Sequence, residues 1–220
     1  MISFIDVSKS YHEANFKKQV FSGMNFNLEK GISVGICGAN GAGKSTLMRL
    51  ISGIEKPSSG RILRTMSTSW PIGYANCFQT SLTGADNARF IARIYNRNER
   101  ELLEFVEDFA QLGPFLRQPV STYSAGMAAR LAFGVSLAID FECYLVDEVT
   151  AAGDERFRAR SEKELLARRD NSTLLMTSHD TGTLKAYCKR GAVLYGGLIA
   201  MYDTIDEACE VHHRLQLLGA

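Results

Sequence analysis

A glycine-rich segment directly after an apolar run is the feature that most constrains the fold of this 220-residue chain. Residues 38–45 read Gly-Ala-Asn-Gly-Ala-Gly-Lys-Ser, which matches GxxxxGK[ST], and the apolar run Ile32–Cys37 precedes them. Glycines let a backbone wrap around a phosphate and direct its N–H groups inward, and the helix that follows adds the positive end of its dipole. The pattern predicts a buried strand, a phosphate-binding loop and a helix over Lys44–Ser52, closed by Gly53.

Every position of this loop has an expected role in holding a nucleoside triphosphate. Lys44 should reach the β- and γ-phosphates, and the hydroxyl of Ser45 should hold Mg²⁺. Taken alone, the loop indicates nucleotide binding and no more, because small-molecule kinases, GTPases and motor proteins share it. The residues predicted to bind nucleotide here are Gly38, Ala39, Asn40, Gly41, Ala42, Gly43, Lys44, Ser45 and Thr46.

The composition is that of one globular domain and narrows the choice of partners. Hydrophobic residues make up 45% and charged residues 22%, which is enough apolar material for a core. Lys and Arg total 25 against 24 for Asp and Glu, so a net charge of +1 gives no reason to expect a nucleic-acid partner. The basic residues between Arg156 and Arg169 alternate with acids, which is typical of a solvated helix face.

Cysteine usage and hydropathy indicate reduced thiols and no membrane span. The 5 cysteines form no CxxC pair, so we expect buried thiols rather than a disulfide framework or a metal site. The most apolar stretch, Leu131–Val146, contains Asp140 and Glu142 and falls short of the ~20 residues that a spanning helix needs. The first residues contain no apolar run like that of a signal peptide. Any membrane work is therefore expected from another subunit.

The order of apolar patterns along the chain predicts an α/β fold interrupted by a helical insert. The spacing becomes helical between about Ala85 and Leu137, with one apolar face at Phe90, Ile91, Ile94 and Tyr95 and another at Leu102, Leu103, Val106 and Phe109. Further predicted strands are Ile2–Val7, Val20–Leu28, Tyr144–Val146, Thr173–Met176 and Ala192–Leu194, and further predicted helices are Glu155–Arg168 and Thr183–Tyr187.

Two acids follow a second apolar strand. Residues 143–146 read Cys-Tyr-Leu-Val and run into Asp147 and Glu148. A buried strand would deliver both carboxylates at its C-terminal edge, where ligands gather in open α/β sheets. Asp147 is expected to support the Mg²⁺ shell, and Glu148 to polarise the attacking water as a general base.

A serine-glycine segment ahead of an apolar helix identifies the family. Residues 123–127 read Tyr-Ser-Ala-Gly-Met, and Arg130 follows three positions later. The chain resembles ATP-binding cassette ATPases, whose signature is usually LSGGQ; it keeps the Ser, the second Gly and the Arg, and departs at three of the five positions. Ser124 would begin a helix whose free N–H groups suit a γ-phosphate. In the family, that phosphate belongs to the ATP bound by the opposite subunit, so the residues carried over are Tyr123, Ser124, Ala125, Gly126 and Met127.

The resemblance implies a P-loop NTPase fold and roles for further residues. It implies a RecA-like core over 1–78 and 138–204 with an antiparallel β subdomain, a helical subdomain over about 79–137, and a short C-terminal helix over about 205–218. It places Tyr11 against adenine, His179 against the γ-phosphate and Asp154 in the D-loop. It also implies ATP and Mg²⁺ as ligands and a homodimer as the working unit.

One family mark fits poorly. The family places a glutamine several residues before a Leu-Thr pair, whereas Gln79 stands only three residues before Leu82. Gln79 is our choice for contact with Mg²⁺ and the catalytic water, and Asn76 is the alternative. Val149 replaces the proline that commonly follows the catalytic Glu.

Further motifs resemble one branch of the family, the ATPase subunits of bacterial capsular polysaccharide exporters. These motifs are Ser69-Trp70-Pro71, Phe78-Gln79 before Ser81-Leu82-Thr83-Gly84, and Asp-Glu-Val-Thr-Ala at 147–151. The resemblance implies two such subunits beneath two copies of a polytopic permease, at the cytoplasmic face of the bacterial inner membrane. It further implies contact, through the permease, with periplasmic and outer-membrane export components.

Three alternatives stay open on the residues alone. Exporters of O-antigen and of teichoic acid are near relatives of this branch. A soluble cassette ATPase of an assembly system belongs to a different class, and co-purification with a membrane protein would separate the two. A catalytically idle regulator is disfavoured because Lys44, Asp147, Glu148 and His179 are all present.

Overall fold

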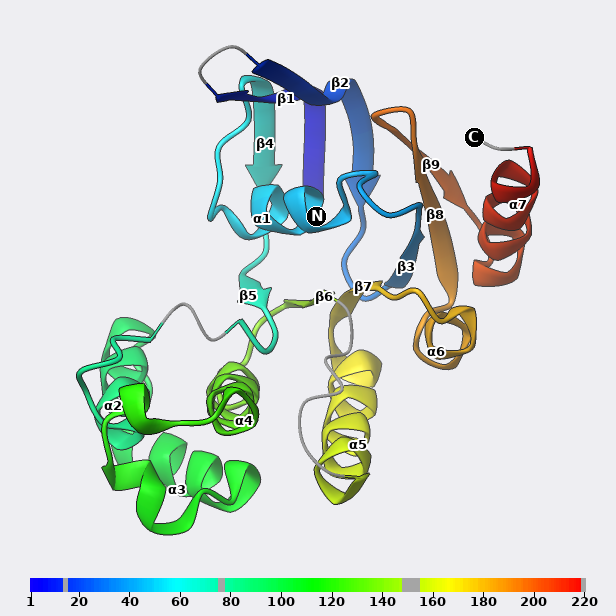
Figure 1. Ribbon diagram of the computed structural model, residues 1–220. Coiled ribbons are helices and arrows are strands. Elements are labelled where there is room, and N and C mark those ends of the chain that lie inside the picture. Colours follow the sequence, from blue (N-terminus) through cyan, green and yellow to red (C-terminus); the bar gives the residue numbers. More distant parts are fainter. Residues whose placement is uncertain (14–15, 75–77, 148–154, 219–220) are drawn as a thin grey trace. The chain divides into compact units, whose positions relative to one another are not determined.

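The computed structural model describes residues 1–13, 16–74, 78–147 and 155–218 (Figure 1). The chain divides into two compact units. The first, which we name the core unit, comprises Met1–Pro71, Phe141–Val149 and Leu166–Ala220. The second, the helical unit, comprises Ile72–Asp140 and Thr150–Leu165. The first half of one helix, α5 (Glu155–Asn171), therefore groups with the insert rather than with the core.

The centre of the core unit is a six-stranded sheet. Its first five strands are parallel, and the last is antiparallel to its neighbour. All five residues of β3 and of β7 are buried, as expected of parallel strands covered on both faces. In spatial order the strands are β5 (Thr68–Pro71), β6 (Cys143–Asp147), β7 (Thr173–Thr177), β3 (Ser33–Cys37), β8 (Arg190–Tyr195) and β9 (Leu198–Tyr202).

A second sheet of the core unit is antiparallel, with β1 (Ile2–Glu13) between β2 (Phe16–Leu28) and β4 (Ser59–Arg64). The strands predicted to end at Val7 and to begin at Val20 are both longer in the structure. The register shifts between Phe4 and Val7, where Asp6 has a φ of 51°. Such a bulge breaks the alternation of apolar and polar residues, so the pattern stops although the pairing continues.

The helix α1 (Lys44–Ser52) has the bounds predicted from the sequence and is central to the core. Leu47, Met48, Leu50 and Ile51 on it are fully buried, in one cluster with side chains of both sheets. Burial of each such side chain contributes about 1.5–3 kcal/mol. Two further helices, α6 (Thr181–Tyr187) and α7 (Ile205–Leu217), pack against β3, and α7 also covers β8.

The helical unit consists of α2 (Gly84–Ile94), α3 (Glu99–Ala110), the short 3₁₀ helices η2 (Gly113–Arg117) and η3 (Val120–Thr122), α4 (Ala125–Leu137) and the first part of α5. Its core includes Phe109, Phe133 and Phe157, whose rings meet at centroid distances of 5.4–6.0 Å. The two apolar faces predicted here have different surroundings. Leu102, Val106 and Phe109 of the second face are buried. In the first face, Ile91 is buried, whereas Phe90 and Ile94 are each 57% exposed.

Two expectations from composition can be compared with the described residues. Cys37, Cys143, Cys188 and Cys209 are buried free thiols, as predicted, and Cys77 lies outside the described residues. In the described parts of the chain, no helix is both long and apolar enough to cross a bilayer.

Candidate functional site

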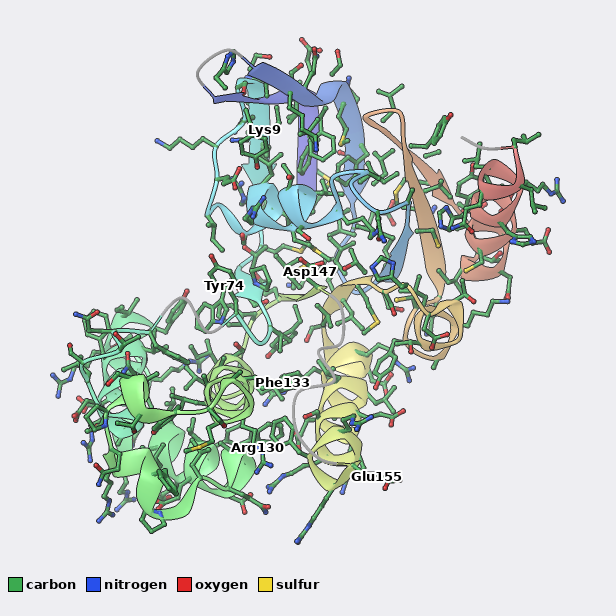
Figure 2. The ribbon with its side chains drawn as sticks, viewed as in Figure 1. Lys9, Tyr74, Arg130, Phe133, Asp147 and Glu155 are labelled. Atoms are coloured by element: carbon green, nitrogen blue, oxygen red, sulfur yellow. The ribbon has the colours of Figure 1, made fainter. Side chains whose placement is uncertain are left out.

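Three neighbouring strands bring most of the predicted nucleotide-binding residues of the core unit to one edge of the sheet. The order β6, β7, β3 is parallel, so the C-terminal ends of these strands lie side by side. Asp147, labelled in Figure 2, ends β6. His179 follows β7 by two residues, and the glycine-rich loop follows β3. A parallel sheet gathers ligand-binding groups at this edge because every strand ends there.

The phosphate loop depends on a glycine directly before α1. Gly43 is the N-cap of the helix and has a φ of 105°, a left-handed conformation that side chains disfavour. A Cβ built on it would lie 2.6 Å from Val20 Cγ1, so no larger residue fits without movement of β2. The N–H groups of the first turn of α1 have no acceptor within the helix, and Gly43 provides no side-chain cap, so an anion in the loop can accept from them.

Lys44 lies inside this loop. Only 8% of it is exposed, and its Nζ donates hydrogen bonds to the carbonyl oxygens of Gly38 (2.6 Å) and Ala39 (3.1 Å). A buried ammonium strongly favours anionic partners, which suits two adjacent phosphates. The side chain of Ser45 is exposed beside it, and that of Thr46 is buried. The predicted grouping of Lys44 and Ser45 on the first turn of a helix is what the structure shows.

Asp147 is held in place by its neighbour strand. Thr177 Oγ1, at the paired position of β7, donates to Asp147 Oδ1 over 2.6 Å. One carboxylate oxygen is thereby oriented, and the half-buried group remains at the sheet edge. Carboxylate and hydroxyl oxygens are the ligands that Mg²⁺ prefers, so Asp147 and Ser45 are suited to it. Glu148, Asp154 and Asn76 lie outside the described residues.

A polar pocket of about 190 Å³ adjoins the beginning of the phosphate loop. Gly38, Asn40 and His179 line it together with His212 and Gln216 of α7. Burial and the nearby Lys44 charge lower the pKa of His212. Burial also raises the pKa of Cys37 to about 12, so the thiol beneath the loop stays protonated. The sequence of α7 contains no motif that indicates this contact with the phosphate loop.

Tyr11, predicted to meet adenine, lies on β1 and is half-buried. Its hydroxyl donates to Glu55 Oε2 over 2.7 Å and lies 3.3 Å from Thr46 Oγ1. The predicted aromatic residue is therefore connected to the helix of the phosphate loop, although 35 residues separate Tyr11 from Thr46.

In the helical unit, the backbone of Gln79 is held by Asn87, a residue that belongs to none of the motifs in the sequence. Asn87 of α2 is 3% exposed; its Oδ1 accepts from Gln79 N (2.9 Å) and its Nδ2 donates to Gln79 O (3.0 Å). The backbone of Gln79 is thus fixed at both polar groups while its side chain remains exposed. An asparagine four residues after Thr83 could have suggested this, because Asn87 Nδ2 also donates to Thr83 O over 2.9 Å.

The signature segment forms the beginning of α4. Ser124 is the N-cap, and its Oγ accepts from Met127 N over 3.2 Å. Ala125 is exposed and Gly126 half-exposed, whereas Leu131–Leu137 are buried. A pocket of about 200 Å³ beside this first turn is lined by Gln111, Leu112, Phe115, Ser124, Gly126, Met127 and Arg130. The helix therefore presents N–H groups and small side chains to the surroundings of the unit.

Backbone contacts connect the signature to the Gln79 segment. Val120 N donates to Leu82 O (2.9 Å), and Ser121 N donates to Thr80 O (2.8 Å). Tyr123 Oη donates to Phe115 O over 2.7 Å and lies against Gly84, the first residue of α2. The 79–84 segment is thereby bonded to the residues that directly precede the N-cap Ser124.

Comparison with known proteins identifies the fold and the family of this chain. The family model of ABC transporters matches residues 21–151. The dimeric ATP-binding cassette MJ0796, solved with ADP and Pi, superposes with a TM-score of 0.79 over 93% of this chain and 99% of that chain. At 19% sequence identity, that match shows the shared fold.

Relatives with known names are similar over nearly the whole chain. CtrD of Neisseria meningitidis, a capsule polysaccharide export ATP-binding protein, is 47% identical over 98% of this chain and all of its own length. BexA of Haemophilus influenzae, an ATP-binding protein, is 44% identical with the same coverage. KpsT of Escherichia coli, a polysialic acid transport ATP-binding protein, is 42% identical over 98% of both chains. The resemblance inferred from the motifs is thereby confirmed, and the chain belongs to the ATP-binding subunits of the ABC transporter family.

Proposed function

We propose that this chain is the ATP-hydrolysing subunit of an exporter of capsular polysaccharide in a bacterial inner membrane. The observation that carries the proposal is similarity from end to end to proteins named for this role, at 42–47% identity. RfbB of Myxococcus xanthus, an O-antigen export ATP-binding protein, and TagH of Lactococcus lactis, a teichoic acids export ATP-binding protein, are each 34% identical, and this chain spans less than half of either. Export of those glycans is therefore the second candidate.

The core unit supplies the groups that bind and cleave ATP in this proposal. Lys44 and the N–H groups of the phosphate loop hold the β- and γ-phosphates, and Tyr11 stacks on adenine. Ser45 and Asp147 hold Mg²⁺, which neutralises charge on the phosphates. Glu148 takes the proton of the attacking water, and His179 holds the γ-phosphate.

The signature segment serves the second subunit of a homodimer. The helix N-terminus at Ser124 and the small residues Ala125 and Gly126 fit a γ-phosphate approaching from outside the helical unit. Each ATP is then held by the phosphate loop of one subunit and the signature of its partner.

The exposed apolar side chains of α2 and of the segment just before it are the proposed contact with the permease. Leu82, Phe90 and Ile94 are 41%, 57% and 57% exposed, within a segment that also holds Gln79. A cytoplasmic helix of a membrane protein could cover these side chains. Cysteines placed between 80 and 95 should therefore crosslink to the permease, with a yield that changes on adding ATP. Crosslinks confined to 205–218 would contradict this surface.

Complementation tests the transport role directly. The test uses a bacterium that lacks its own capsule-export ATPase but keeps its permease. We expect this chain to restore capsule to the cell surface and the Lys44→Ala variant to restore none. Surface polysaccharide is measured with a capsule-specific antibody. Restoration of O-antigen display instead, in a matched O-antigen mutant, would assign the second candidate. ATPase activity with no association with any permease would favour the assembly class.

A further inference from the structure

We infer that Glu55 is a positioning residue that fixes Tyr11 as a one-sided stacking platform for the adenine of ATP. The inference rests on the proposed role of Tyr11. Glu55 follows α1 in a segment that matches none of the family motifs discussed above.

Three side chains converge on the Glu55 carboxylate. Tyr11 Oη donates to Oε2 over 2.7 Å, and Lys9 Nζ lies 3.0 Å from the same oxygen. Arg49 Nε lies 2.7 Å from Oε1 as an ion pair, although its N–H is not aligned for a hydrogen bond. The Glu55 side chain is only 22% exposed, so these contacts are partly shielded from water. They join β1, which carries Lys9 and Tyr11, to α1, which carries Arg49.

Electrostatics keeps the carboxylate charged. Burial alone would raise the pKa of Glu55, but the hydrogen bonds from Tyr11 and Lys9 and the charge of Arg49 outweigh it and lower the pKa below its usual value. Glu55 is therefore ionised at neutral pH, and a charged acceptor binds the Tyr11 hydroxyl more strongly than a neutral one. The hydroxyl fixes the direction of the ring.

Lys9 occupies one face of the Tyr11 ring. Its Nζ lies 4.9 Å from the centroid of Tyr11 and also donates to Lys56 O over 3.0 Å. An ammonium at this distance is attracted to the ring face, and Glu55 holds it there. A base that stacks on Tyr11 must therefore use the opposite face.

The network also reaches the phosphate loop. Tyr11 Oη lies 3.3 Å from Thr46 Oγ1, and Arg49 Nη2 lies within 3.3 Å of Tyr11 Oη and 3.4 Å of Thr46 Oγ1. Thr46 is two residues after Lys44 on α1. Tyr11 Oη is thus held both by Glu55 and by side chains of α1, the helix that begins at Lys44.

The experiment separates the base from the phosphates. Dissociation constants for Mg·ATP and for inorganic tripolyphosphate, which lacks a base, are measured by competition with a fluorescent nucleotide. Glu55→Ala should weaken ATP about tenfold, the loss expected for one charge-assisted contact, and leave tripolyphosphate within about twofold. Glu55→Gln, whose amide oxygen still accepts from Tyr11, should weaken ATP about threefold. Glu142→Gln is the matched control, because Glu142 also pairs with a lysine, Lys30, in the core unit.

Tyr11 variants distinguish the two ways of failing. Tyr11→Ala should weaken ATP more than Glu55→Ala, and the double variant should be no weaker than Tyr11→Ala alone. Parental ATP affinity in Tyr11→Ala would overturn the role of Tyr11 and the inference with it. A weakened Tyr11→Ala beside a parental Glu55→Ala would overturn the inference alone. Two further results would show that Glu55 has a purely structural role and would also overturn the inference. One is equal weakening of ATP and tripolyphosphate binding in both Glu55 variants. The other is a lower melting temperature with no change in the ratio of the two dissociation constants.

Discussion

The core unit and the helical unit present their candidate site residues in opposite ways. In the core unit, Lys44 is buried in its loop and Asp147 is fixed by Thr177, so each group is supported by residues of the same unit. In the helical unit, the signature turn at Ala125 is exposed at the beginning of α4, and Phe90 is 57% exposed. The first arrangement is organised before a ligand arrives. The second presents groups to something beyond its own unit.

This difference in exposure corresponds to a difference in role. Groups that must neutralise phosphate charge benefit from preorganisation, since no reorganisation is then needed when charge develops. Groups that bind a partner must remain accessible until the partner docks, so they stay exposed instead of packing within their own unit. The contacts from Leu82 to Val120 and from Tyr123 to Gly84 connect two such accessible surfaces within the helical unit.

The largest expected effect falls on the chemistry assigned to the core unit. Glu148→Gln should slow ATP turnover by about 10²–10⁴-fold, the usual contribution of a positioned base, and leave ATP binding intact. An ATP-bound dimer should accumulate, because closure precedes cleavage. Steady-state hydrolysis, nucleotide titration and size-exclusion chromatography with ATP measure the three quantities. Near-parental turnover in a clean preparation would remove Glu148 from the catalytic role.

The second prediction contrasts one change in each unit. Lys44→Ala should weaken ATP binding and turnover together, because it removes the cation between the phosphates. Gly126→Asp should lower turnover by about 10²–10³-fold through repulsion of the γ-phosphate, while a single chain binds ATP as before. Ser45→Ala should weaken binding mainly when Mg²⁺ is present. If Gly126→Asp abolished ATP binding by the monomer, the signature would belong to the same chain's site, and the contrast between the units would fail.

Mixing these two variants tests whether each site is shared. One site of the mixed dimer collects both changes, while the other has an intact phosphate loop and an intact signature. Hydrolysis should recover from the level of either homodimer to at most about half the parental rate, if the two sites act independently. Dimers carrying both tags must be isolated before the assay. A parental rate of hydrolysis in either mutant homodimer would refute the shared site. An inactive mixed dimer with ATP bound in its intact site would show that hydrolysis requires two intact sites.

The sequence predicted the parts of the site whose chemistry is local. The loop over 38–45 and the strand ending at Asp147 occupy consecutive residues, so pattern and mechanism coincide there, and α1 was predicted with its observed bounds. The contacts of Asn87 with Gln79 and of Glu55 with Tyr11 depend on how the chain packs, and residue type alone does not reveal them. Apolar spacing at helical period likewise cannot distinguish buried Val106 from exposed Phe90.

Proximity to the phosphate loop was also not apparent for α7. His212 stands next to another histidine in an ordinary amphipathic helix, and its position is set by the packing of α7 against β3 and β8. A helix that covers a sheet can meet any loop at the edge of that sheet. The meeting point depends on the crossing angle and the register, which the spacing of apolar residues does not fix.

The smallest expected effect comes from Gly84→Ala, which tests the connection inside the helical unit. On helix propensity alone alanine should stabilise α2 by up to about 1 kcal/mol. Its Cβ would, however, collide with Tyr123 Oη and lie 3.1 Å from Leu116 Cδ1. We therefore expect a net loss of stability of about 1–3 kcal/mol and a displaced Tyr123.

Displacement of Tyr123 moves the signature but none of the core unit's phosphate-binding groups. Turnover of Gly84→Ala should fall about three- to tenfold, while ATP binding by the single chain stays parental. Tyr123→Phe removes the hydroxyl that the new Cβ meets, at the cost of its bond to Phe115 O. The Gly84→Ala/Tyr123→Phe double variant should consequently lose less turnover than the two single variants lose together. A double-mutant cycle on turnover measures this difference. Strict additivity, or an equal loss of monomer ATP affinity, would mean that Gly84 acts through the general stability of α2 and not through the signature.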